Sequence, residues 1–165
     1  MTDDAGVPPG RPGTGAEPTA ADRHWLREAI ELSKQCPASR SAFCVGALIV
    51  SADGEVMASG FSRQNDPADH AEEVALAGVD PGDPRLGSAT LYSSLEPCRY
   101  RASRPRPCAD LVIGSGIGRV VIAWLEPPVF AKGGGATALR EAGITVAQAG
   151  ELADEAKRVN AAVLG

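Results

Sequence analysis

The sequence has few cysteines, few histidines and no excess of basic residues. Four cysteines in 165 residues are too few for a disulfide-stapled scaffold, and a chain of this length does not need one. A formal net charge of −5 argues against a general nucleic-acid binder, because neutralising phosphates requires a basic surface. No stretch has the length of a membrane span, and the opening MTDDAGVPPG lacks the apolar run of a signal peptide. We therefore expect a cytoplasmic protein with no membrane partner.

The composition is that of a globular domain, with 44% apolar and 22% charged residues. The length suits one domain with a real core and is short for two. Residues 1–18 are mainly Gly, Pro, Thr and Asp, so they bury too little surface to offset their ordering entropy. We predict a disordered N-terminal tail over 1–18 and one domain over 19–165.

Apolar patterning in the domain alternates between strand and helix periods. Predicted strands cover residues 45–50, 55–62, 89–97, 119–126 and 144–149. Predicted helices cover residues 19–36, 70–79, 108–117, 135–143 and 151–164. An Asp-Gly pair joins the first two strands as a hairpin, whereas a helix separates the last two, which can therefore run parallel. The alternation predicts a layered α/β domain.

One imidazole and two thiols form a candidate metal site. His70 opens a predicted helix, Cys98 follows a predicted strand, and Cys108 opens the next predicted helix. Thiolates and neutral imidazole are ligands that Zn²⁺ selects, and three protein ligands leave a fourth position for water, as in catalytic zinc sites. Cys36 and Cys44 are given no such role: Cys36 is expected to be inert and Cys44 to pack inside.

Glu72, two residues after His70, is the candidate proton carrier. Water on zinc ionises near neutral pH, and a nearby carboxylate can move its proton to a ring nitrogen and a leaving amine. Alone, His-x-Glu at a helix start is most often a surface pair, and buried cysteines are often small hydrophobic residues. The combination favours a site, although the H-x-E…P-C-x-x-C deaminase signature is met only in part, because nine residues separate Cys98 and Cys108.

The segment SSLEPCRYRASRPRPC also crowds four arginines between the two cysteines. They are Arg99, Arg101, Arg104 and Arg106. Guanidinium groups offer charge-assisted donors to a substrate phosphate, with Arg104 the first candidate. The alternative is a solvated basic loop that contacts acidic surface. Phe43, Tyr100 and Trp124 are available to stack on a base, although Trp124 is more typical of a core.

From about residue 24 onward, the segments HAE, SSLEPC and SRPRPC resemble the cytidine deaminase-like superfamily, above all the pyrimidine deaminase domain of riboflavin biosynthesis. This resemblance implies a three-layer α/β/α sandwich with a five-stranded mixed sheet whose last two strands are parallel. It implies Zn²⁺ held by His70, Cys98 and Cys108, with Glu72 as the acid/base. It places the substrate-binding residues at Arg104, Ala71, Ser62 and Phe43. It also implies a homodimer or a higher homo-oligomer.

The chain departs from that family in ways that leave the substrate open. The cysteine spacing is one residue longer than usual, and Ala42 stands where the family has a substrate-contacting Asn. The segment SAFCVGA instead resembles nucleoside cytidine deaminases. The first prediction is a deaminase of diaminohydroxyphosphoribosylaminopyrimidine, a small-molecule pyrimidine nucleotide. The first alternative is deamination of cytidine or deoxycytidylate. The second alternative is a non-catalytic deaminase-like zinc-binding module, and a nucleic-acid editor is the least favoured function.

Overall fold

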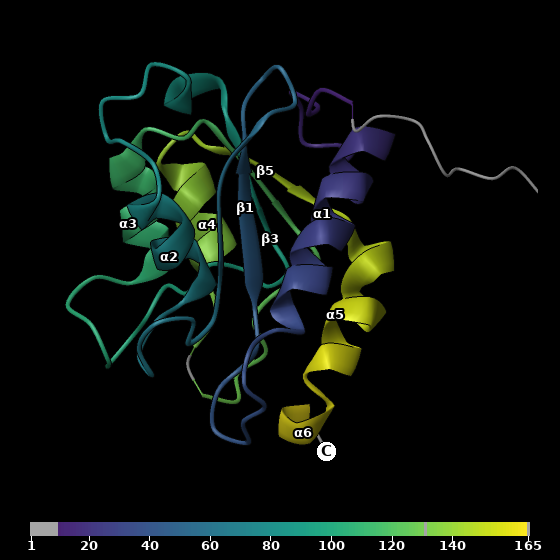
Figure 1. The fold of residues 1–165 in the computed structure, drawn as a ribbon, viewed down its shortest axis with the longest axis vertical. Coiled ribbons are helices and arrows are strands. Elements are labelled where there is room, and N and C mark those ends of the chain that lie inside the picture. Colours follow the sequence, from purple (N-terminus) through teal and green to yellow (C-terminus); the bar gives the residue numbers. More distant parts are fainter. Residues whose placement is uncertain (1–9, 131, 165) are drawn as a thin grey trace, which may run out of the picture.

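The computed structural model describes residues 10–130 and 132–164, in which helices and strands alternate after a first hairpin (Figure 1). The elements are α1 (Ala20–Ser33), β1 (Gly46–Val50), β2 (Val56–Phe61), α2 (Ala71–Ala77), η1 (Leu86–Ser88), β3 (Thr90–Ser93), α3 (Cys108–Ser115), β4 (Arg119–Ile122), α4 (Gly135–Glu141), β5 (Thr145–Gln148), η2 (Gly150–Leu152), α5 (Ala153–Val159) and α6 (Ala161–Leu164). Every predicted strand is present with tighter bounds. The predicted last helix divides into η2, α5 and α6. In the part of the chain that the structure describes, no helix is both long and apolar enough to cross a membrane.

The five strands form one mixed sheet in the order β2-β1-β3-β4-β5. β1 pairs antiparallel with both β2 and β3, whereas β3, β4 and β5 are parallel. The predicted mixed sheet with parallel last strands is therefore confirmed. This topology points β2, β3, β4 and β5 in one direction, so their carboxyl ends meet at one edge of the sheet, where α/β proteins commonly bind ligands.

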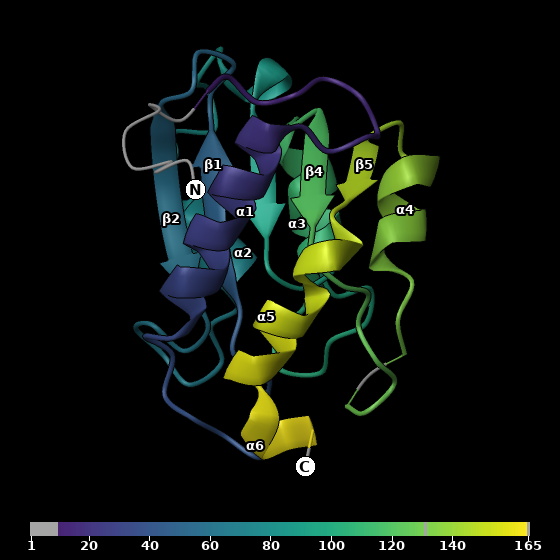
Figure 2. The same cartoon turned by 90° about the vertical axis from the view of Figure 1, so that its right-hand side faces the viewer.

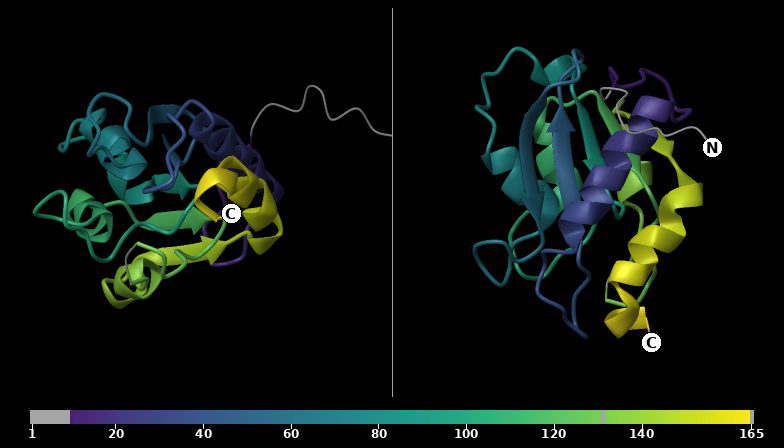
Figure 3. Two further views of the ribbon diagram at one scale, coloured as in Figure 1. Left: turned by 90° about the horizontal axis from the view of Figure 1, so that it is seen from below. Right: turned by 45° about the vertical axis from the view of Figure 1, so that its right-hand side comes forward.

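Helices cover both faces of the sheet, as the predicted three-layer sandwich requires. Figures 2 and 3 show α1 and α5 on one face and α2, α3 and α4 on the other. The middle strands β1, β3 and β4 are buried along their whole length, as expected for strands that are covered on both faces. At Gly46 the α1 backbone lies so close that a Cβ atom would stand 1.9 Å from the Ala29 carbonyl oxygen, so only glycine fits.

The first helix begins with a capping box. The Thr19 hydroxyl accepts a hydrogen bond from the Asp22 amide at 3.2 Å, and the Asp22 carboxylate accepts one from the Thr19 amide at 2.8 Å. Residues 10–18 differ from the predicted disordered tail, because their backbone is bonded to the domain. For example, the Arg119 guanidinium donates to the carbonyl of Gly15 at 3.0 Å. Residues 1–9 of the predicted tail lie outside the described residues.

Cys36 and Cys44 form a disulfide, which corrects the expectation that both stay unpaired. The turn between α1 and β1 brings their Cα atoms to 5.6 Å, a separation that the sequence pattern does not reveal. Asn160, between α5 and α6, accepts a hydrogen bond from the Cys44 amide at 2.6 Å and donates one to the Cys44 carbonyl at 3.0 Å. The disulfide and Asn160 together fix the two ends of residues 37–43.

Candidate active site

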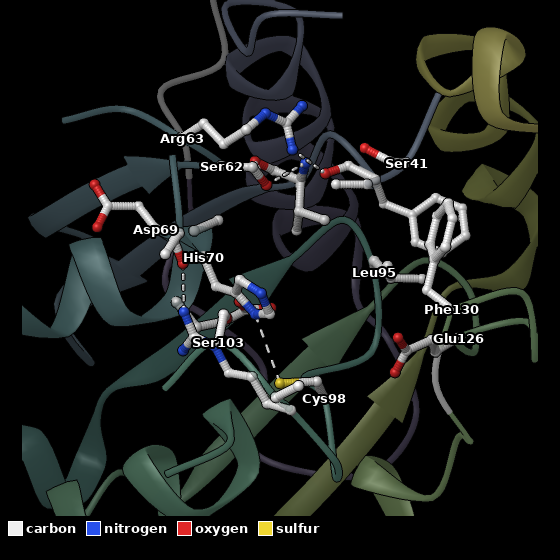
Figure 4. A pocket seen from close by; sticks show the side chains of 18 of the residues that line it. Ser41, Ser62, Arg63, Asp69, His70, Leu95, Cys98, Ser103, Glu126 and Phe130 are labelled. Carbon is white, nitrogen blue, oxygen red and sulfur yellow. Dashed lines mark hydrogen bonds between the residues drawn. The ribbon is translucent and has the colours of Figure 1, made fainter. Parts of the chain in front are cut away.

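His70, Cys98 and Cys108 converge although they come from three segments. Their ligand atoms all lie within 4.8 Å of one another. His70 is the N-cap of α2, Cys98 lies beyond the end of β3, and Cys108 is the first residue of α3. His70 Nδ1 is 3.6 Å from Cys98 Sγ and 3.4 Å from Cys108 Sγ; the contact with Cys98 is drawn in Figure 4. The structure thus brings the three predicted ligands together.

The donor set and its spacing fit a tetrahedral zinc ion. Zn–S and Zn–N bonds of about 2.3 and 2.0–2.1 Å at tetrahedral angles place a sulfur and a nitrogen about 3.5 Å apart. The two observed N···S distances of 3.4 and 3.6 Å lie on either side of this value. No fourth His, Cys, Asp or Glu among residues 10–130 and 132–164 joins the cluster. These residues therefore fit an ion with three protein ligands.

The environment of Cys98 favours its thiolate form. The Cys108 thiol, the His70 imidazole and the Cys108 backbone amide all contact its sulfur, and the amide donates at 3.2 Å. These hydrogen bonds hold the pKa of the Cys98 thiol well below its usual range. The same hydrogen bond between the two sulfurs, together with burial, raises the pKa of Cys108. A deprotonated sulfur is thus ready at the place where a cation would bind.

Glu72 lies next to this cluster without belonging to it. Its side chain is buried, and the Ser93 hydroxyl donates to its Oε1 at 2.7 Å. Burial raises the pKa of Glu72. A buried carboxyl group with a raised pKa and a fixed orientation is suited to take up and release a proton.

Glu73, the next residue, makes a different set of contacts, with the backbone of His70 and with Arg101. Its carboxylate accepts hydrogen bonds from the His70 amide at 2.9 Å and from the Arg101 guanidinium at 2.6 Å. The Arg101 side chain is only 2% exposed, and its Nη1 is 4.0 Å from Cys108 Sγ. Arg101 therefore ties the loop between the two cysteines to the start of α2. The sequence placed this residue in a basic loop but did not predict its ion pair.

A cavity of about 380 Å³ opens beside the cluster at the carboxyl edge of the sheet (Figure 4). The predicted site residues that line it are Phe43, Ser62, His70, Ala71, Glu72 and Cys98. Phe43 packs edge-on against Trp124 and Phe130, with ring centroids 5.7 and 5.1 Å apart. Ser62 is committed to the backbone, because it accepts a hydrogen bond from the Val45 amide at 2.9 Å.

Arg104, the predicted phosphate ligand, does not line this cavity. Its guanidinium faces three carboxylates instead, with nitrogen–oxygen distances of 3.4 Å to Asp66, 3.3 Å to Asp69 and 3.7 Å to Glu73. The structure therefore does not bring Arg104 together with the other predicted site residues.

Glu126 lines the cavity and was not predicted. Its Oε2 is buried and has no hydrogen-bond partner among the described residues. Burial, assisted by the negative charges of Cys98, Glu96 and Glu72, raises the pKa of Glu126 to about 7. Glu96 holds the adjacent loop by accepting hydrogen bonds from the amides of Glu126 at 2.9 Å and Ala136 at 2.7 Å. The sequence feature that could have indicated Glu126 is its position just beyond the apolar segment of β4, at the carboxyl edge of the sheet.

The fold and the His-Cys-Cys cluster define a zinc-binding domain of the deaminase type. The family model described as the cytidine and deoxycytidylate deaminase zinc-binding region matches residues 19–124, so the chain belongs to this family. The chain is 38% identical over 124 residues to the diaminohydroxyphosphoribosylamino-pyrimidine deaminase of Schizosaccharomyces pombe, covering 74% of this chain and 30% of that protein. It is 35% identical over 140 residues to the enzyme of the same name from Buchnera aphidicola subsp. Schizaphis graminum, covering 84% of this chain and 90% of that protein.

Solved structures give the same grouping. RibD from Acinetobacter baumannii superposes with a TM-score of 0.74 at 32% identity, covering 87% of this chain and 39% of that chain. The Rib2 deaminase of Aspergillus oryzae superposes with a TM-score of 0.74 at 25% identity, covering 86% of this chain and 91% of that chain. The chain thus spans less than half the length of the Schizosaccharomyces and Acinetobacter proteins.

Proposed function

We propose that the chain is a zinc-dependent hydrolytic deaminase whose substrate is diaminohydroxyphosphoribosylaminopyrimidine. The observation that carries this proposal is the meeting of His70, Cys98 and Cys108 with Glu72 beside one cavity. The relatives named diaminohydroxyphosphoribosylamino-pyrimidine deaminase support the choice of substrate, because one of them is covered over 90% of its length.

In this proposal His70, Cys98 and Cys108 hold the zinc ion. When bound, zinc supplies a Lewis acid that lowers the pKa of water to near neutrality. Glu72 takes a proton from the water whose oxygen adds to the amine-bearing carbon and delivers it to the neighbouring ring nitrogen. It then moves the second proton of that water to the amine, which leaves as ammonia when the C–N bond breaks. Ser93 keeps the carboxyl group in place through its hydrogen bond to Oε1. Glu126 offers its Oε2, which accepts no hydrogen bond from the part of the chain that the structure describes, to an N–H group of the ring.

Ammonia release from three substrates tests the assignment. We expect release from diaminohydroxyphosphoribosylaminopyrimidine and little or none from cytidine or deoxycytidylate. Cytidine and deoxycytidylate are included for two reasons. Ala42 stands where the riboflavin-pathway family has a substrate-contacting Asn, and the segment SAFCVGA resembles nucleoside cytidine deaminases. Activity on cytidine alone would remove the riboflavin-pathway assignment and leave a zinc deaminase.

Metal content tests the ligand set. We expect about one zinc ion per purified chain, and a large loss of bound zinc in Cys98→Ser and Cys108→Ser, because removing one of three ligands weakens a site of this kind. Inductively coupled plasma mass spectrometry after gel filtration measures the ratio. Cys44→Ser is the matched control and should keep its zinc, because Cys44 lies in the disulfide and outside the cluster. Equal zinc in the Cys98 and Cys44 variants would contradict the ligand assignment.

We further propose that the protein works in the cytoplasm as a homodimer or a higher homo-oligomer. Its family resemblance supports the oligomer. Light scattering on the purified protein measures the assembly mass, and a monomer at working concentration would contradict the proposal.

A further inference from the structure

Two arginines of the described residues line the cavity, and they differ in whether a carboxylate lies beside the guanidinium group. Arg101 is paired with Glu73 at 2.6 Å and is buried. Arg63 also lines the cavity, but no carboxylate of the described residues lies within 4.0 Å of its guanidinium nitrogens. Because an arginine stays protonated at any working pH, Arg63 brings an uncompensated positive charge to the cavity wall.

Arg63 is nevertheless held in place. It lies two residues after β2 with φ at 57°, and its amide donates to the Asp69 carbonyl at 2.9 Å. Its guanidinium donates to the carbonyls of Phe43 at 3.3 Å and Pro37 at 2.6 Å. It also contacts the sulfurs of the Cys36–Cys44 disulfide at 2.8 and 3.2 Å.

All of these acceptors are neutral. Carbonyl oxygens and disulfide sulfurs orient a guanidinium group but do not cancel its charge. They engage only the two terminal nitrogens, Nη1 and Nη2, and no group among residues 10–130 and 132–164 accepts a hydrogen bond from Nε–H. A pre-oriented, uncompensated guanidinium with a spare donor is the arrangement that binds a phosphate group.

The position of Arg63 relative to the proposed reaction centre agrees with this role. Figure 4 shows Arg63 on one side of the cavity, near Ser41 and Ser62, and Cys98 and Glu126 on the other side. A substrate whose amine lies at the metal cluster would extend its far end toward Arg63.

Arg104 is in the opposite electrostatic situation. Three carboxylates already compensate its charge, and a phosphate bound there would lie beside Asp66, Asp69 and Glu73. Such an anion would be repelled by the net negative charge of that cluster.

We propose that Arg63, and not Arg104, binds the phosphate of the substrate and makes the cavity select phosphorylated over unphosphorylated aminopyrimidine ribosides. The inference deepens the proposed function and rests on it. Residues 37–43 and the disulfide serve as the frame that holds Arg63 in position.

The experiment compares deamination of the phosphorylated substrate with that of the same compound after phosphatase treatment. We expect Arg63→Gln to lower the ratio of the two kcat/KM values by about tenfold to a hundredfold, the usual effect of losing a hydrogen bond to a charged group. Arg63→Lys should restore part of the ratio, because it keeps the charge. A loosened loop would affect both compounds alike, so the ratio isolates the phosphate contact.

Arg104→Gln is the rival variant and Arg106→Gln the matched control, since Arg106 donates to the Asp110 carbonyl and does not line the cavity. Neither should change the ratio. A ratio that falls in the Arg104 variant and not in the Arg63 variant overturns the proposal.

Binding of ribose 5-phosphate by isothermal titration calorimetry separates this inference from the proposed function, because it needs no turnover. Weaker binding by Arg63→Gln than by the wild type supports the inference even if the wild-type protein deaminates neither compound, a result that would refute the proposed function alone. Equal binding by the variant and the wild type refutes the inference even if the protein is an active deaminase.

Discussion

Replacing Glu72 by Gln is expected to lower kcat for ammonia release by about 10²- to 10⁴-fold, the usual contribution of a general acid–base group. Glutamine has nearly the same shape and can still accept the Ser93 hydrogen bond that Oε1 accepts now at 2.7 Å. It cannot take up a proton, however. Because Glu72 is not part of the His-Cys-Cys cluster, the variant should keep both its fold and its zinc.

Three measurements on one preparation check this prediction: steady-state ammonia release, zinc content and a circular dichroism melt. Glu28→Gln is the matched control, because Glu28 is an exposed carboxylate on α1 far along the chain from the site. Unchanged turnover in the Glu72 variant would remove its catalytic role. A wild-type protein that binds zinc but turns over none of the three substrates would instead favour the non-catalytic zinc-binding module.

The part of the site that could be predicted from sequence consists of residues whose positions follow from the neighbouring helices and strands along the chain. His70 and Glu72 lie two residues apart at one helix start, and Cys98 and Cys108 border the next strand and helix, so secondary structure alone places each of them. The parallel strands could be predicted for the same reason, because a helix between β4 and β5 excludes a hairpin.

The part that could not be predicted depends on side chains that meet across long sequence separations. Arg104 was proposed from the resemblance of the SRPRPC segment to the family motif, but its partners Asp66 and Asp69 are 38 and 35 residues earlier in the chain. Spacing within one motif does not report the charges that surround it. Arg63 was overlooked for the same reason, since only the folded chain shows that it lies at the cavity with no carboxylate of the described residues beside it.

Residues 10–18 illustrate a limit of composition. Few large apolar side chains argue against burial, but this segment is held by its backbone groups. Gly13 donates its amide to Asp22 at 3.1 Å, Gly15 accepts from Arg119, and Gly10 accepts from the Trp25 indole at 3.2 Å. Composition gives no information on such hydrogen bonds, because every residue type carries a backbone carbonyl.

The Asp22–Arg119 ion pair joins this segment, α1 and β4, and removing its carboxylate is expected to destabilise the fold strongly. The two terminal nitrogens of the Arg119 guanidinium each donate to one Asp22 carboxylate oxygen at 2.8 Å, and the Tyr92 hydroxyl donates to Oδ1 at 2.6 Å. The Asp22 side chain is fully buried and that of Arg119 is 6% exposed. Asp22→Asn leaves the Arg119 charge buried without a partner, which typically costs about 3–5 kcal/mol and lowers the melting temperature by about 6–20 °C.

The pH dependence of this loss follows from the state of Asp22. Burial opposes its ionisation, but the hydrogen bonds from Arg119 and Tyr92 outweigh burial and lower the pKa of Asp22 well below its usual 3.8. A carboxylate with a lowered folded-state pKa stabilises the fold above its unfolded-state pKa and loses that effect as the pH falls through the folded-state value. The stability difference between wild type and Asp22→Asn should therefore be full at neutral pH and shrink below about pH 4.

Urea titrations between neutral and acid pH measure this difference in the free energy of unfolding. Tyr92→Phe is the control, because it keeps the ion pair and should lose less stability. A difference that stays constant down to acid pH would show that packing, and not the carboxylate charge, makes Asp22 important.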